Sequence, residues 1–126
     1  MSNPSHAQDA RVIAIRDRNP RATAHLLVIS REHIPSVKDL APEHLDLLRH
    51  MVGTGKRLLA DDGYPEDSAD TRFGFHRPPF ASVPHLHLHC LGAPFVPHWN
   101  RLRFSETLLR SYVSAESVLA ALVRRA

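Results

Sequence analysis

A chain of 126 residues is long enough for one compact domain and too short for two independent ones. Its formal net charge is +3 and 43% of its residues are hydrophobic, which is typical of a globular protein and excludes a disordered or collagen-like chain. The single cysteine, Cys90, excludes an internal disulfide framework and a cysteine-based zinc finger.

The first elements expected along the chain are a lead segment and a hairpin. Residues 1–10 are polar and show no periodicity, so we expect a disordered lead followed by one folded domain over residues 11–126. The apolar runs at residues 12–15 and 24–29 predict two strands joined by a turn at residues 17–20. Together they predict an antiparallel hairpin.

The next elements are a long helix and two strands. Apolar residues recur at helical spacing between residues 42 and 60, where Gly53 and Gly55 weaken the helix unless another element packs closely there. A strand is expected at residues 71–75, then a proline-bearing loop, then a strand at residues 85–91 that ends at Gly92.

A C-terminal helix completes the predicted elements. It is expected at residues 115–125, with Ser114 as its N-cap and arginines in its last turn. No apolar run approaches the ~20 residues of a membrane helix, and the polar start lacks a signal-peptide core. These features predict a soluble, cytoplasmic protein with no membrane partner, and leave a nuclear or peroxisomal location open.

Histidines alternate with apolar residues along the predicted strand at residues 85–91. His85, His87 and His89 are three of the ten histidines in the chain. Because alternate side chains of a strand point to opposite faces, we expect the three imidazoles on one face and their apolar neighbours in the core. The pattern predicts a site that works by imidazole chemistry.

Two kinds of chemistry fit such a row of imidazoles. Histidines at i and i+2 can bind zinc, but His85 and His89 would lie about 13 Å apart along a flat strand, and His25 is the only further strand-borne ligand. A neutral imidazole can instead attack phosphorus while its neighbours handle protons, with no metal or cofactor. We favour the hypothesis that a histidine attacks phosphorus, and we keep metal-dependent hydrolysis as an alternative.

The segment from His85 to Leu91 resembles the signature of the histidine triad (HIT) superfamily, in which histidines alternate with apolar residues. The resemblance extends upstream to the predicted hairpin and covers residues 12–92. The segment Phe75-His76-Arg77-Pro78-Pro79-Phe80 is similar to the Hint branch close to aprataxin, including plant Hint-type proteins with adenylylsulfatase or phosphoramidase activity.

This resemblance implies an α+β, HIT-like fold in which a twisted antiparallel sheet packs with one long central helix and a C-terminal helix. It also implies a homodimer that binds a nucleotide substrate and hydrolyses AMP conjugates, such as adenosine 5'-phosphoramidate, AMP-lysine or adenylyl sulfate. A nucleic-acid partner is disfavoured. The other function left open is a regulatory module that binds nucleotide without cleaving it.

The resemblance also implies a role for each candidate site residue. His87 would be the nucleophile that is transiently adenylylated, and His89 would contact the phosphate and the leaving group. His85 would orient His87, and His25 would complete a hydrogen-bonded chain of imidazoles. The nucleotide-binding residues would be Asp17 at the ribose, Ser82 at the phosphate, and His76 at a position that departs from many relatives. Arg77 is a further candidate for a contact to the nucleotide or the leaving group.

Overall fold

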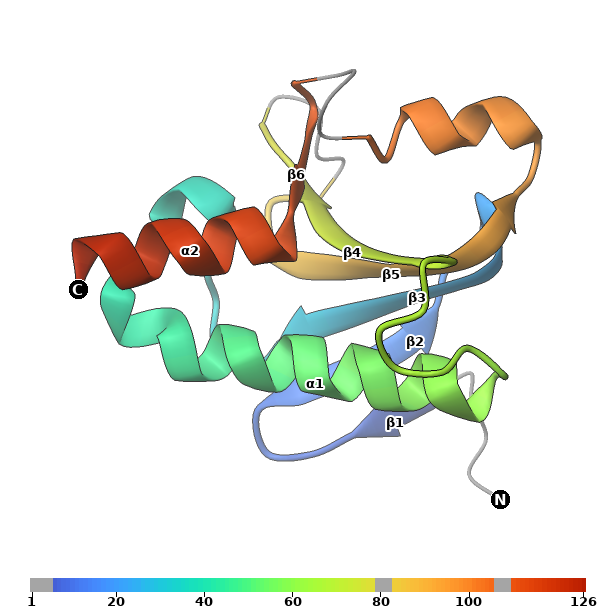
Figure 1. Cartoon of the computed structure of the whole chain (residues 1–126). Helices are drawn as coiled ribbons and strands as arrows, with labels where there is room; N and C mark the ends of the chain where they lie inside the picture. Colours follow the sequence, from blue (N-terminus) through green and yellow to red (C-terminus); the bar gives the residue numbers. More distant parts are fainter. Residues whose placement is uncertain (1–5, 79–82, 106–109) are drawn as a thin grey trace.

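The computed structural model describes residues 6–78, 83–105 and 110–126. In these ranges the chain forms one antiparallel sheet of six strands in the order β1-β2-β3-β5-β4-β6 (Figure 1). The strands are β1 (His6–Gln8), β2 (Val12–Arg16), β3 (Ala22–Ser30), β4 (Thr71–His76), β5 (His87–Phe95) and β6 (Tyr112–Ser114). Their long central members, β3 and β5, pair along most of their length.

Helices cover one face of this sheet. In the part of the chain that the structure describes, the α-helices are α1 (Leu45–Asp61) and α2 (Ala115–Arg125), and the 3₁₀ helices are η1 (Val37–Asp39), η2 (Pro42–His44) and η3 (His98–Leu102). In Figure 1, α1 lies below the sheet, α2 lies at the left and contacts α1, and η3 lies above the sheet. The predicted α+β architecture, an antiparallel sheet with a long central helix and a C-terminal helix, is confirmed.

The core lies between the sheet and α1. Leu88 and Cys90 of β5 are completely buried there, as are Leu48 and Leu59 of α1. The two helix glycines behave differently: a Cβ on Gly55 would lie 2.5 Å from the Cys90 sulfur, whereas a Cβ on Gly53 would meet nothing within 4 Å. Close packing therefore accounts for Gly55 and not for Gly53.

Several predicted elements are confirmed and others differ. The hairpin, the long helix, β4 and the helix capped by Ser114 are present. The expectation of a disordered lead over residues 1–10 is wrong for residues 6–8, which form β1 because the edge of β2 offers free backbone partners. Residues 1–5 lie outside the described ranges. β5 continues past Gly92 to Phe95, and β6 was not anticipated.

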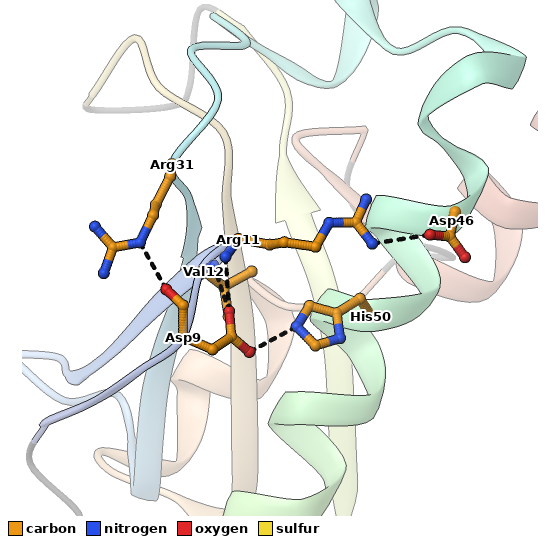
Figure 2. A network of polar contacts seen from close by, with 6 residues as sticks. All are labelled: Asp9, Arg11, Val12, Arg31, Asp46 and His50. Atoms are coloured by element: carbon orange, nitrogen blue, oxygen red, sulfur yellow. Dashed lines mark hydrogen bonds and ion pairs between the residues drawn. The ribbon is translucent and has the colours of Figure 1, made fainter.

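A polar network holds the β1–β2 turn against α1 (Figure 2). Oδ1 of Asp9 accepts hydrogen bonds from the backbone N–H groups of Arg11 and Val12, at 2.8 and 2.9 Å. The other carboxylate oxygen lies 2.8 Å from His50 Nε2, and Arg11 forms an ion pair with Asp46. The backbone N–H donors lower the pKa of Asp9 to about 2, so the turn keeps its acceptor across the neutral range.

None of the helices in the described ranges is both long and apolar enough to cross a membrane.

Candidate active site

The candidate site lies on the face of the sheet opposite α1. In β5, Leu88 and Cys90 enter the core, so the alternating side chains of His87 and His89 project to the other face. His25 comes from the neighbouring strand β3, and its side chain meets that of His89 on the same face. Pairing of the two long central strands thus brings together residues that are more than 60 positions apart in the sequence.

His87 is held in one tautomer by the backbone. Its Nδ1–H donates to the carbonyl oxygen of His85 at 2.7 Å. Since a carbonyl can only accept, the proton of the neutral ring lies on Nδ1 and the lone pair lies on Nε2. The ring is half-buried at the surface of the site. In the neutral ring, Nε2 is therefore the nitrogen that is available as a nucleophile.

His25 and His89 form a directed hydrogen-bonded pair. The backbone N–H of Arg21 donates to His25 Nδ1 at 3.0 Å, so the proton of the neutral His25 ring lies on Nε2. That Nε2–H donates to His89 Nδ1 at 2.9 Å. The expected link between His25 and the triad is thus present as a direct hydrogen bond.

The chain of imidazoles extends to β4. Because His89 Nδ1 accepts, its Nε2–H donates to His76 Nδ1 at 3.3 Å, and His76 Nε2–H donates to the carbonyl oxygen of Arg103 at 3.0 Å. The ring of Phe104 lies 4.9 to 5.6 Å from the rings of His25, His76 and His89 and covers them. Arg103 and Phe104 were missed from sequence because no local pattern sets them apart in the tail.

All three rings of this chain are held neutral by burial. Burial lowers the pKa of His89 well below its usual range, and it lowers the pKa of His25 to about 4. Burial also lowers the pKa of His76, and the charge of Arg103 acts in the same direction on His76 and His89. At neutral pH the site contains uncharged imidazoles.

His85 lies just before the strand on which the sequence predicted it. The strand begins at His87, so His85 precedes it, and its Nε2–H donates to the carbonyl oxygen of Ser30 at 2.6 Å while Nδ1 lies 3.0 Å from His33 Nδ1. The side chain of His85 therefore contacts the end of β3. It is the backbone carbonyl of His85, which any residue could supply, that contacts His87.

The predicted nucleotide-binding residues Asp17 and Arg77 lie at different parts of the sheet. Asp17 Oδ2 lies 3.5 Å from His25 Nε2, beside the imidazole chain, while Oδ1 accepts from the backbone N–H of Asn19. Arg77 Nη1 donates to the carbonyl oxygen of Arg110 at 2.8 Å, which ties it to the β6 side of the sheet. Ser82 lies outside the described residues.

A set of metal-ligating donors also lies in this region. Asp17, His25 and His89 offer ligand atoms that all lie within 4.8 Å of one another. This set contains only one of the three triad histidines, so it differs from the row of ligands that the sequence pattern suggested. In the structure the two histidines of the set are joined by their own hydrogen bond.

Comparison with known protein families and sequences shows what the chain resembles. The family model described as "Scavenger mRNA decapping enzyme C-term binding" matches residues 2–104 of this chain. A bifunctional adenosine 5'-phosphosulfate phosphorylase/adenylylsulfatase, HINT4 of Arabidopsis thaliana, is 45% identical over 114 residues, which cover 88% of this chain and 76% of that protein. The adenosine 5'-monophosphoramidase HINT3 of Mus musculus is 40% identical over 68% of this chain, and the match spans only 52% of that relative.

Solved structures show the same fold. A HIT family hydrolase from Legionella pneumophila Philadelphia 1 matches with a TM-score of 0.65 and 30% identity, covering 71% of this chain and 81% of that one. An aprataxin ortholog, Hnt3, solved in complex with DNA, covers 98% of this chain and 70% of its own with a TM-score of 0.68. At 19% identity, that second match shows the fold alone.

Proposed function

Because this chain belongs to the histidine triad superfamily, we propose that it is a hydrolase that cleaves AMP conjugates at the α-phosphorus through a covalent nucleotidyl-histidine. The observation that carries the proposal is the tautomer of His87, whose Nδ1–H is fixed on the His85 carbonyl. The lone pair of Nε2 is then ready to form a bond to phosphorus.

The reaction proceeds in two displacements. His87 Nε2 supplies the electron pair of a new P–N bond, and the bond from phosphorus to the leaving group breaks with its electron pair going to the leaving atom. Sulfate departs as the anion, and an amine departs once its nitrogen has taken up a proton from solvent. The ring then carries phosphorus on Nε2 and its original proton on Nδ1, so the positive charge that forms is stabilised by the His85 carbonyl. Water attacks phosphorus in the second step, the P–N bond breaks, AMP departs, and a proton from the water passes to solvent.

Neighbouring residues have supporting roles in this proposal. The ring of His89 lies 5.2 Å from that of His87, and its Nε2–H would contact the phosphate and the leaving group in place of His76 Nδ1. His25 holds His89 in the tautomer whose Nε2–H points away from His25. Asp17 would accept hydrogen bonds from the ribose hydroxyls, and Ser82 would bind the phosphate. The contacts of His76 and Arg77 to nucleotide remain predictions.

The substrate class follows from the relatives, which are named as acting on adenosine 5'-phosphosulfate or adenosine 5'-monophosphoramidate. Both compounds are AMP conjugates that differ in the group leaving phosphorus. We propose adenylyl sulfate, adenosine 5'-phosphoramidate and AMP-lysine as the panel to test. A homodimer remains a prediction to be checked by light scattering.

Turnover of this panel by wild-type protein and by two histidine variants tests the proposal. We expect His87→Ala to lose on the order of 10³-fold or more in kcat/KM, because the variant lacks the nitrogen that forms the P–N bond in this mechanism. His50→Ala is the matched control: His50 lies on α1 beside Asp9, on the other side of the sheet, and its removal should change kcat/KM less than twofold. Full activity in His87→Ala would overturn the mechanism.

Two other functions make different forecasts in the same assay. A regulatory module would bind AMP but cleave none of the conjugates. A metal-dependent hydrolase is favoured only by the ligand set of Asp17, His25 and His89. It predicts that a chelator abolishes turnover and that zinc restores it, whereas attack by His87 predicts no effect of either.

A further inference from the structure

One peptide unit fixes the tautomer of His87. The carbonyl oxygen of His85 accepts from His87 Nδ1–H at 2.7 Å. On the other side of the same peptide bond, the N–H of Leu86 donates to the carbonyl oxygen of Ile34, also at 2.7 Å. Because a trans peptide bond is planar and its C=O and N–H point in opposite directions, holding the N–H also sets the direction of the C=O. The hydrogen bond that orients His87 therefore depends on residues 30–34, where β3 ends.

The side chain of His85 binds the same segment. Its Nε2–H donates to the carbonyl oxygen of Ser30 at 2.6 Å. Ser30 is buried and its hydroxyl donates to the carbonyl oxygen of Glu32 at 2.9 Å, so the acceptor has a fixed place at the end of β3. The ring of His85 thus connects the end of β3 to the residue whose carbonyl contacts His87.

His33 completes the hydrogen bonding of the His85 ring. Since Nε2–H of His85 donates to Ser30, Nδ1 of the neutral ring has the lone pair. Nδ1 of His33 lies 3.0 Å from that nitrogen and is therefore the donor, and the centroids of the two rings are 5.0 Å apart. With both nitrogens of its ring in hydrogen bonds, His85 is held in one orientation.

Building on the proposed function, we propose that His33 is a positioning residue for the attack by His87. It acts through the ring of His85 and, together with the carbonyl of Ile34, fixes the peptide unit that keeps the proton of His87 on Nδ1. The two hydrogen bonds of this peptide unit also strengthen each other, because each polarises the amide that they share. The role of His33 is indirect: it keeps the lone pair of His87 on Nε2, the nitrogen that forms the P–N bond.

A change at His33 should leave the fold intact. The side chain of His33 is exposed, whereas Ser30 and Ile34 are buried. The backbone hydrogen bond between Leu86 and Ile34 does not involve the side chain of His33 and remains when that side chain is replaced. A variant of His33 therefore loosens the ring of His85 without opening the core, and its kinetics can be compared directly with those of the wild-type protein.

Kinetics of His33→Ala and His33→Asn with adenylyl sulfate test the proposal. The side-chain amide of Asn has N–H donors close to the place of an imidazole Nδ1–H, whereas Ala has none. We expect kcat of His33→Ala to fall by between about threefold and tenfold, the effect of one lost hydrogen bond, while the affinity for AMP changes less than about twofold. His33→Asn should recover most of the lost activity. His50→Ala, again the control, should change neither quantity.

The nitrogen NMR shifts of His87 give a readout that a merely structural role would not move. In protein with isotope-labelled histidine and no substrate, Nδ1 of the neutral His87 ring should show the shift of a protonated nitrogen and Nε2 that of an unprotonated one. In His33→Ala the two shifts should move toward each other as the second tautomer becomes populated, and His33→Asn should restore them. His85→Gln can still donate to Ser30 but has no acceptor for His33, so adding His33→Ala to it should have no further effect.

Unchanged nitrogen shifts of His87 in His33→Ala would overturn the inference, whatever the kinetics. So would a fall in kcat that is matched by an equal fall in AMP affinity, or one that His33→Asn does not recover. Failure of the proposed function looks different: wild-type protein would then cleave none of the conjugates. Because the nitrogen shifts are measured without substrate, they decide in that case too whether His33 holds His87 in its tautomer.

Discussion

Acid should destabilise this protein over the pH range in which an ordinary histidine becomes charged. His25 has its pKa lowered to about 4 by burial in the folded state, while in the unfolded chain it titrates near 6.5. Between these two values the unfolded state binds more protons than the folded one. The contribution of His25 to the free energy of unfolding is therefore fully present above pH 6.5 and decreases as the pH falls toward 4. Below pH 4 this residue causes no further loss.

The magnitude follows from the size of the shift. A change from 6.5 to about 4 at 1.36 kcal/mol per pKa unit gives roughly 3 kcal/mol for His25 alone. Lowered pKa values at His76 and His89 add loss of the same sign. Asp9 acts in a different window: with its pKa lowered to about 2, its contribution is present above pH 3.8 and is lost only in stronger acid.

Urea unfolding followed by circular dichroism at pH values from 4.5 to 8 measures this dependence. Imidazole C–H resonances in the folded protein provide a residue-level check, since His25, His76 and His89 should stay neutral through pH 6.5. A free energy of unfolding that is constant between pH 4.5 and 6.5 would refute the reasoning. So would a titration of these three rings near pH 6.5.

Three further predictions concern packing and capping. Gly53→Ala should raise the free energy of unfolding by up to about 1 kcal/mol. Gly55→Ala should lower it by about 1 kcal/mol or more, because the new methyl group has no room. Thermal unfolding of the two variants measures both effects. Gly74→Ala should lower both Tm and kcat/KM, because its Cβ would overlap the Tyr112 ring beside the imidazole chain, and unchanged kinetics would speak against that contact. Ser114→Ala should destabilise the protein by about 1 kcal/mol by removing the N-cap of α2, seen as a lower urea midpoint.

Much of the fold could be predicted because several elements have strong local patterns. The hairpin and the long helix follow from the period of their apolar residues, and the C-terminal helix also has a capping serine. β1 and β6 were missed because each has only three residues, too few to show a periodic pattern. Each forms by pairing with another strand, β1 with β2 and β6 with β4. Tertiary pairing decides such short strands.

The candidate site was predictable only in part. Alternation placed His87 and His89 on one face correctly, but it could not show that the strand starts after His85, whose ring turns to Ser30 and His33. The contribution of Arg103 was also out of reach, because it is a backbone carbonyl that closes the imidazole chain. Side-chain identity carries no information about which backbone carbonyl will accept a hydrogen bond.

Trapping the covalent intermediate tests the central claim most directly. Wild-type protein is mixed with adenylyl sulfate, quenched in alkali within milliseconds to preserve phosphorus–nitrogen bonds, digested, and examined by mass spectrometry. An AMP adduct on the peptide that contains His87, absent in His87→Ala, is the predicted result. Release of AMP with no adduct on any histidine, or an adduct on a different residue, would contradict the account.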